Sequence, residues 1–71
     1  MKIGEEKRLI EIIEDIAKGK IKHDLKLHYE YGLSYRLHID DLRMIAYNGT
    51  GLCAGKVLND KFKLEGWYKD E

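Results

Sequence analysis

The sequence predicts an α+β domain, in which one N-terminal amphipathic helix packs on a meandering antiparallel sheet of about four strands. Three observations predict this class. Apolar residues recur with helical spacing over residues 5–18, they alternate with polar residues over 25–39, and short apolar segments separated by turn residues follow. The chain has 71 residues, so we expect residues 1–71 to form a single domain, with its sheet over about 24–68.

The helix is predicted over residues 5–18. At about 100° per residue, the apolar side chains of this segment share one arc, and charged side chains fill the opposite side. The apolar arc consists of Leu9, Ile10, Ile12, Ile13, Ile16 and Ala17. Glu5 and Glu6 would lie at the positive end of the helix dipole, and Gly19 can adopt the left-handed conformation that ends a helix. Because such a helix is unstable alone in water, we expect it to cover one face of the sheet.

The alternating segment 25–39 predicts two strands joined by a hairpin. Its apolar residues all carry odd numbers, and Gly32 lies at its middle. Unbroken odd parity requires a loop with an odd number of residues, centred on Gly32. The expected cross-strand pairs are Tyr29 with Tyr35, Leu27 with Leu37, and Leu25 with Ile39. A glycine bulge in one bent strand would also preserve the parity, but we favour the hairpin.

The segment 42–47 fits either a third strand or a helical turn capped by Asp40 or Asp41. As a strand, its even-numbered residues would share one face. The run Asn48-Gly49-Thr50-Gly51 is a strong turn signal, and small apolar pieces follow it. We favour a strand, a turn and a short returning strand, followed by a final alternating strand at residues 61–65.

The charge balance disfavours a nucleic-acid partner. The sequence has 13 basic and 13 acidic residues, which give a formal net charge of zero, and no segment is strongly cationic. The single cysteine, Cys53, excludes an intramolecular disulfide, and no window is apolar enough to span a membrane. The N-terminal residues lack the apolar run of a signal peptide, so we expect a cytoplasmic protein without membrane attachment.

No segment carries a complete cofactor or metal motif. Gly49–Lys56 has the look of a phosphate loop, but Thr50 occupies the place of the first glycine, and Val57 that of the Mg²⁺-binding serine or threonine. In the expected hairpin, His28 and His38 lie on the outer face at different levels, each opposite a cationic residue, without the further ligands that zinc needs. We therefore expect neither a cofactor nor a metal.

The sequence also predicts no catalytic residue. Cys53 lies between Leu52 and Ala54, which favours a small buried side chain over a nucleophile. Asp40 and Asp41 are adjacent, so in a strand they would point to opposite faces and could not share a proton. They are typical of a turn or a helix cap, and we expect a protein that is not an enzyme.

Aromatic residues carry the strongest functional signal. The sequence holds five tyrosines, one tryptophan and one phenylalanine, of which we expect Tyr29, Tyr35 and Phe62 in the core. Large side chains at exposed edges are typical anchors of protein interfaces. The residues beside the hairpin turn and after the last strand therefore predict a partner-binding surface that consists of Tyr31, Leu33, Trp67 and Tyr68. The alternative is that Trp67 covers an open end of the core.

Three segments resemble small uncharacterised proteins of phages and prophages in Gram-positive bacteria. They are the helix Leu9–Gly19 with its Ile-Ala-Lys-Gly end, the tyrosine-rich hairpin, and Val57–Glu65, where Leu-Asn-Asp precedes an alternating strand. The resemblance covers about half of the chain and departs from the family at Lys18, where those proteins usually carry asparagine. It implies a cytoplasmic accessory protein made during infection or carried in a prophage. The layout is also loosely similar to phage anti-defence proteins that sequester signalling nucleotides.

These observations predict a small non-enzymatic accessory protein that binds a host or phage protein, as an inhibitor of host defence or metabolism. The first alternative is a homo-oligomeric protein that binds or sequesters a nucleotide-like small ligand, with a ligand loop at Asn48, Gly49, Thr50, Gly51 and Lys56. A homodimer would also help to stabilise so small a domain. The second alternative is a nucleic-acid-binding protein that uses the exposed aromatic residues with Arg36, Lys56, Lys61 and Lys63.

Overall fold

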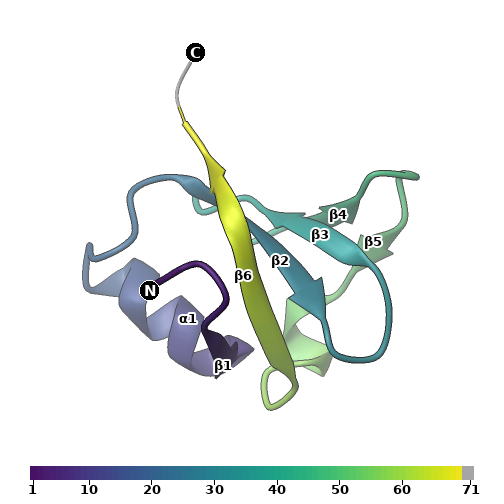
Figure 1. Ribbon diagram of the computed structural model, residues 1–71, viewed down its shortest axis with the longest axis horizontal. Coiled ribbons are helices and arrows are strands. Elements are labelled where there is room, and N and C mark those ends of the chain that lie inside the picture. The colour runs from purple at the N-terminus through teal and green to yellow at the C-terminus, as the bar shows by residue number, and fades with distance from the viewer. Residues whose placement is uncertain (70–71) are drawn as a thin grey trace.

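The computed structural model describes residues 1–69 and consists of one α-helix beside a six-stranded antiparallel sheet (Figure 1). The elements are β1 (Glu6–Arg8), α1 (Leu9–Ala17), β2 (Asp24–Tyr29), β3 (Ser34–Leu37), β4 (Met44–Ala46), β5 (Gly51–Leu52), the 3-10 turn η1 (Ala54–Lys56) and β6 (Lys61–Tyr68). The strand order is β1-β6-β2-β3-β4-β5. The α+β class is confirmed, but the expected four strands are six, because the short strands β1 and β5 extend the sheet at its two edges. Within residues 1–69, no helix has the length and the apolar composition needed to cross a membrane.

Helix α1 begins at Leu9 because the residues before it form β1, which pairs with the first half of β6. The first N–H groups of the helix are bonded to the chain just before β6. Leu9 donates to the carbonyl of Asp60 at 3.0 Å, and Ile10 donates to that of Leu58 at 2.9 Å. The predicted start at residue 5 was therefore wrong, because long-range pairing overrides the local charge pattern. The helix closes as predicted, with Gly19 at a φ of 75°.

The core lies between α1 and one face of the sheet, named here the inner face. Leu9 and Ile12 of α1 are fully buried against it. The strand residues that were predicted to point inward do so, except that Ile39 lies in the turn after β3. Val57, which follows the turn η1, is buried as well. The buried residues are Leu9, Ile12, Ile21, Leu25, Leu27, Tyr35, Leu37, Met44, Ala46, Val57, Phe62 and Leu64. Tyr29, which was also expected in the core, is half-buried at its margin.

The opposite face of the sheet, named here the outer face, is not covered by a helix in residues 1–69 (Figure 1). The strand register defines its side chains: Asp24, Lys26, His28, Ser34, Arg36, Ile45, Lys63, Gly66 and Tyr68. A β-bulge lies where β6 passes Lys26 and Leu27 of β2. The extra residue reverses the alternation along β6, so Tyr68 lies on the outer face and Trp67 on the inner face.

The β2–β3 hairpin keeps the predicted parity, but its predicted register was wrong by two residues. The observed pairs are Leu25 with Leu37, Lys26 with Arg36, Leu27 with Tyr35, and His28 with Ser34. The turn accounts for the shift, because Tyr29 donates its N–H to the carbonyl of Leu33 at 3.0 Å, so the loop is centred on Tyr31 and not on Gly32. Ile39 consequently lies beyond the ladder, in the turn before β4, where the carboxylate of Asp24 accepts its N–H at 3.1 Å.

The ambiguous segment 42–47 contains a strand, as favoured. Strand β4 pairs with β3 on one side and, across a turn, with β5 on the other. The Oδ1 atom of Asn48 accepts the N–H of Thr50 at 3.0 Å within this turn. Asp41 accepts the N–H of Arg43 at 3.1 Å, so the aspartate pair forms a turn, as expected. The expectation that Cys53 is buried was wrong, because this residue lies exposed where the chain leaves β5 for η1.

We expect Ile12→Ala to lower the free energy of unfolding by about 2–5 kcal/mol, because it removes a fully buried side chain from the contact between α1 and the sheet. Urea denaturation followed by circular dichroism measures this loss. Ile3→Ala is the matched control, since Ile3 is 63% exposed, and we expect a loss below about 0.5 kcal/mol. Similar losses in the two variants would contradict this core.

The hydroxyl of Tyr29 connects β2 to the turn before β6. It donates to a carboxylate oxygen of Asp60 at 2.6 Å, and its ring stacks on Phe62 with a centroid distance of 4.8 Å. The hydrogen bond to Asp60 raises the pKa of Tyr29 to about 12. Only the protonated hydroxyl can donate. The stabilisation that this hydrogen bond provides is therefore present below the ordinary pKa of 10.0 and is lost as the pH rises towards about 12.

Urea titrations of the wild type and Tyr29→Phe at a series of alkaline pH values test this linkage. We expect the wild type to be the more stable protein below a pH of about 10, and its advantage to disappear by a pH of about 12. The phenylalanine variant is the control for all other groups that titrate in this range. An advantage that stays constant over the whole range would show that Tyr29 does not act through its proton.

Candidate functional site

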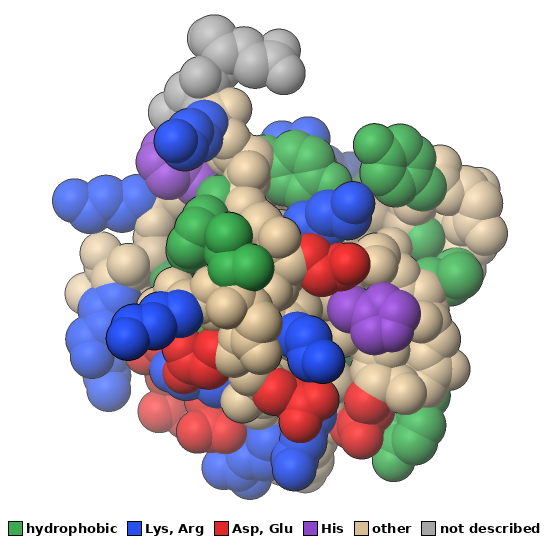
Figure 2. All heavy atoms as spheres, in the orientation of Figure 1, with side chains coloured by type: hydrophobic (Ala, Val, Ile, Leu, Met, Phe, Trp, Pro, Cys, Tyr) green, Lys and Arg blue, Asp and Glu red, His purple; other side chains and the backbone are tan. Residues whose placement is uncertain are grey.

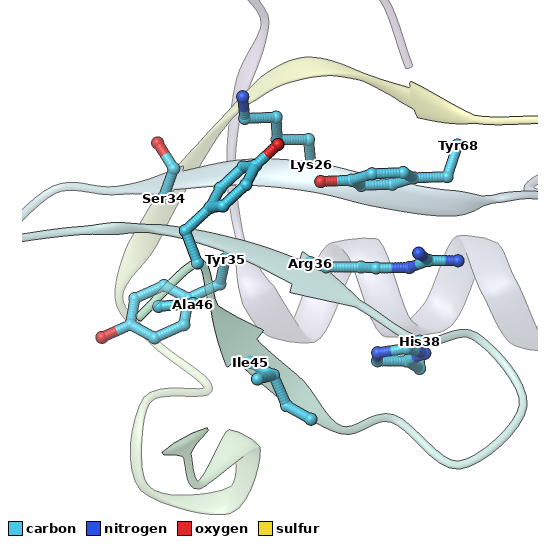
Figure 3. A pocket seen from close by; sticks show the side chains of 9 residues that line it. Lys26, Ser34, Tyr35, Arg36, His38, Ile45, Ala46 and Tyr68 are labelled. Atoms are coloured by element: carbon cyan, nitrogen blue, oxygen red, sulfur yellow. The ribbon is translucent and has the colours of Figure 1, made fainter. Parts of the chain in front are cut away.

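The candidate site is a hollow of about 320 Å³ on the outer face, bordered by Tyr47 and Tyr68 and named here the outer hollow (Figure 3). Its lining consists of Lys26, Ser34, Tyr35, Arg36, His38, Ile45, Ala46, Tyr47 and Tyr68. No acidic side chain lines it, although the chain as a whole carries as many acidic as basic residues. A volume of this size lies at the lower end of the range for ligand pockets.

The floor of the outer hollow is one row of residues that runs across the sheet. Ile45 of β4 pairs with Arg36 of β3, Arg36 pairs with Lys26 of β2, and Lys26 pairs with Gly66 of β6. Gly66 has no side chain, and the space where a Cβ atom would project is open. The row therefore places two cations side by side, with an apolar side chain at one end and free space at the other.

Arg36 is held in place by a polar cluster at one end of the hollow. Its Nε and Nη2 atoms donate to Asp24 at 3.0 and 2.8 Å, and the ring of Tyr68 covers its guanidinium at 4.2 Å. His38 Nδ1 lies 3.3 Å from the same carboxylate. Burial alone would raise the pKa of Asp24. The hydrogen bond from the N–H of Ile39 and the ion pair with Arg36 outweigh it and lower this pKa below its ordinary value.

Lys26 is the other cation of the row, and it differs from Arg36 in its surroundings. Its ammonium lies 5.6 Å from the centroid of the Tyr47 ring, a distance typical of a cation–π contact. Among residues 1–69, no carboxylate lies within 4.0 Å of this ammonium. The positive charge of Lys26 is therefore not compensated by an ion pair in this part of the chain.

A second polar cluster joins His28, Ser34 and Glu65 at the other end of the hollow. The hydroxyl of Ser34 donates to Glu65 and lies 3.2 Å from Nδ1 of His28. A nucleophilic serine instead gives its proton to a histidine that an acid orients. Here the hydroxyl of Ser34 donates its hydrogen bond to the carboxylate of Glu65 instead. The three residues consequently form a polar chain on the sheet and lack the order of a nucleophile, a base and an acid.

The structure separates the aromatic residues that the sequence singled out. Tyr31 and Leu33 lie in the β2–β3 loop and are 74% and 45% exposed. Trp67 and Tyr68 lie beside the other end of β2 and, as adjacent strand residues, point to opposite faces. Leu33 lines a smaller depression that also includes Lys26 and Tyr47. Leu33 and Tyr68 thus border the outer face. A role of all four residues in partner binding stays a prediction.

Sequence reasoning missed Tyr47, which is the most exposed large hydrophobic residue of the described chain at 91%. It follows β4 directly, and its direction depends on whether residues 42–47 are strand or helix. The alternation of Met44 and Ala46 with Ile45 was the signal that could have placed it on the outer face.

The other sequence-predicted site residues do not converge. Asn48, Gly49 and Thr50 form the β4–β5 turn, Gly51 belongs to β5, and Lys56 lies in η1. Lys61 and Lys63 lie on β6, and Figure 2 shows basic and acidic side chains intermixed over the visible face. His28 lies on the outer face as predicted, but the predicted cross-strand partners of the two histidines were wrong, since His28 lies opposite Ser34 and His38 follows the end of β3. Within residues 1–69, no three His, Cys, Asp or Glu side chains are close enough to hold a metal ion.

No protein-family model, curated protein or solved structure matches this chain. Function must therefore be argued from the chemistry of the site itself. The outer hollow offers two aromatic rings, one fixed arginine, one lysine without an ion pair among residues 1–69 and an apolar floor residue.

We expect Asp24→Asn to destabilise the fold by roughly 1–3 kcal/mol, because the amide loses the charge that Arg36 and the N–H of Ile39 contact. Since the pKa of Asp24 is lowered, its contribution is present above the ordinary value of 3.8 and is lost as the pH falls through the lowered value. Acid titrations followed by circular dichroism measure both effects. Asp40→Asn, at an exposed turn position, is the control and should leave the acid transition unchanged. Equal acid transitions in the wild type and Asp24→Asn would refute the linkage.

Proposed function

We propose that this chain is a small non-enzymatic accessory protein of a phage or prophage that binds another protein through the outer face of its sheet. Its place would be the cytoplasm of the bacterial host, where it would inhibit the protein that it binds. One observation carries the proposal: the uncovered face presents Tyr47 and Tyr68 around Arg36 and Ile45. Tyrosine and arginine are the residues that most often dominate the energy of protein interfaces, and an apolar floor lets a partner exclude water.

The fixed position of Arg36 and the exposure of Tyr47 in the outer hollow support this proposal. Arg36 is already fixed by Asp24 and by the ring of Tyr68, so a partner would lose little side-chain entropy by contacting it. Tyr47 is 91% exposed, so nearly its whole ring is available for burial. The sheet edges are poor docking sites in comparison, since β1 has three residues and β5 has two. We therefore place the partner on the face of the sheet.

The volume of the outer hollow favours a second candidate, a homo-oligomer that binds a nucleotide-like small ligand. The hollow holds about 320 Å³ and is open to solvent, so a second copy of the chain would be needed to enclose a ligand. Thermal-shift measurements with nucleotides, together with native mass spectrometry, test this candidate. A monomer without a shift would remove it.

We expect Tyr47→Ala/Tyr68→Ala to weaken partner binding by at least about tenfold, because both rings would be buried in the interface. The immobilised wild type and variants are exposed to a lysate of a phage-infected Gram-positive host, and retained proteins are quantified by mass spectrometry. Tyr31→Ala is the matched control, since Tyr31 is 74% exposed but lies away from the outer hollow. Unchanged circular dichroism spectra establish that all variants are folded.

This binding experiment distinguishes the outer face from the surfaces around Tyr31 and Trp67 as the docking site. One stoichiometric protein that the double variant loses and Tyr31→Ala retains is the expected result. Retention by the double variant and loss by Tyr31→Ala or Trp67→Ala would overturn the outer face as the docking surface. If the wild type retains nothing, the protein-binding function itself fails, and the small-ligand candidate takes its place.

A further inference from the structure

The charge distribution of the outer hollow specifies what it can receive. Lys26 and Arg36 are direct cross-strand partners, and two like charges in this position repel each other. Asp24 compensates Arg36 with two hydrogen bonds. No acidic residue among residues 1–69 does the same for Lys26. The row therefore holds one cation with an ion pair, Arg36, and one without an ion pair among residues 1–69, Lys26.

The surroundings of Lys26 leave its ammonium accessible from one side. Its neighbour in the row on β6 is Gly66, beyond whose backbone the space is open. Tyr47 covers the ammonium from another side at 5.6 Å. Figure 3 shows the ring of Tyr68 directed along the sheet, with its hydroxyl beside the aliphatic stem of Lys26, whose ammonium points away from it. An anion that enters beside Gly66 would therefore be bound by the ammonium of Lys26.

We propose that the outer hollow binds one carboxylate side chain, an aspartate or a glutamate, from an extended segment of the partner protein. The carboxylate would pair with Nζ of Lys26, and an adjacent aliphatic side chain of the same segment would pack on Ile45 and the two tyrosine rings. This inference rests on the proposed function and names the chemistry that the partner presents. It also accounts for the apolar residue Ile45 beside the two cations of the row.

The charges around the hollow favour a single carboxylate over a nucleic-acid strand. A strand carries one phosphate per nucleotide and needs a continuous line of cations along its path. Among residues 1–69, Arg36 is paired with Asp24, and Lys26 is the cation of the row without an ion pair. A single carboxylate needs only one such cation, whereas a nucleic-acid strand needs several in line.

A selection of random peptides of about a dozen residues, displayed on filamentous phage, tests this inference without knowledge of the partner. Peptides are selected on the wild type and in parallel on Lys26→Met, which keeps the aliphatic stem and removes the charge. Lys56→Met is the matched control, since Lys56 is an exposed lysine of η1 outside the hollow. Lys26→Arg restores the charge, and circular dichroism establishes that each variant is folded.

We expect the wild type to enrich peptides with an Asp or Glu at a fixed position beside an aliphatic residue. Synthetic copies of these peptides should bind Lys26→Met at least about tenfold more weakly, and bind Lys26→Arg and Lys56→Met as they bind the wild type. Enriched peptides without an acidic residue, equal binding to Lys26→Met, or no enrichment at all would overturn the inference. Tighter binding of a single-stranded oligothymidylate, with a steep salt dependence, would overturn it in favour of a nucleic acid.

The two proposals fail in different ways. If the lysate partner is lost with Tyr47→Ala/Tyr68→Ala but retained by Lys26→Met, the carboxylate pocket is wrong and the docking face stands. If the partner is retained by both variants, the docking face is wrong as well.

Discussion

The structure depends on one constraint: a single nine-residue helix can cover only one face of a six-stranded sheet. The buried strand residues therefore point to that face, and Leu9 and Ile12 of α1 complete the core against them. The other face is left to water, and its residues must satisfy their own charges and hydrogen bonds there. The features that suggest function are found on this second face because the first is fully committed to folding.

Asp24 takes part both in the fold and in the outer hollow. Its carboxylate accepts the N–H of Ile39 where the chain leaves β3. The same carboxylate holds Arg36, which Tyr68 covers. One side chain thus contacts both the backbone after β3 and the arginine in the floor of the outer hollow. The burial that would raise the pKa of this group is outweighed by these contacts, so it stays charged in the folded protein.

The sequence predicts those parts of the fold that depend on local pattern. Odd parity over 25–39 identified the inner face, and the turn at Asn48 identified the β4–β5 connection. The hairpin register depends on whether the loop is centred on Tyr31 or on Gly32, which odd parity alone does not decide. Two features depend on long-range pairing and could not be read locally: β1 and the bulge in β6. The candidate site is of the same kind. Alternation shows which face a residue occupies, but only the pairing of four strands brings Ile45, Arg36, Lys26 and Gly66 into one row.

The repulsion between Lys26 and Arg36 in that row is an argument that the row serves binding. A residue that contributed only to folding would not be expected as lysine at position 26, since a neutral or acidic side chain opposite Arg36 would avoid like-charge repulsion. The ring of Tyr47 attracts the ammonium but leaves its charge without a counterion among residues 1–69. Local conflicts of this kind are expected where binding and not stability determines the residue. A partner's carboxylate would relieve the repulsion, so the free energy that the fold loses at Lys26 would be recovered on binding.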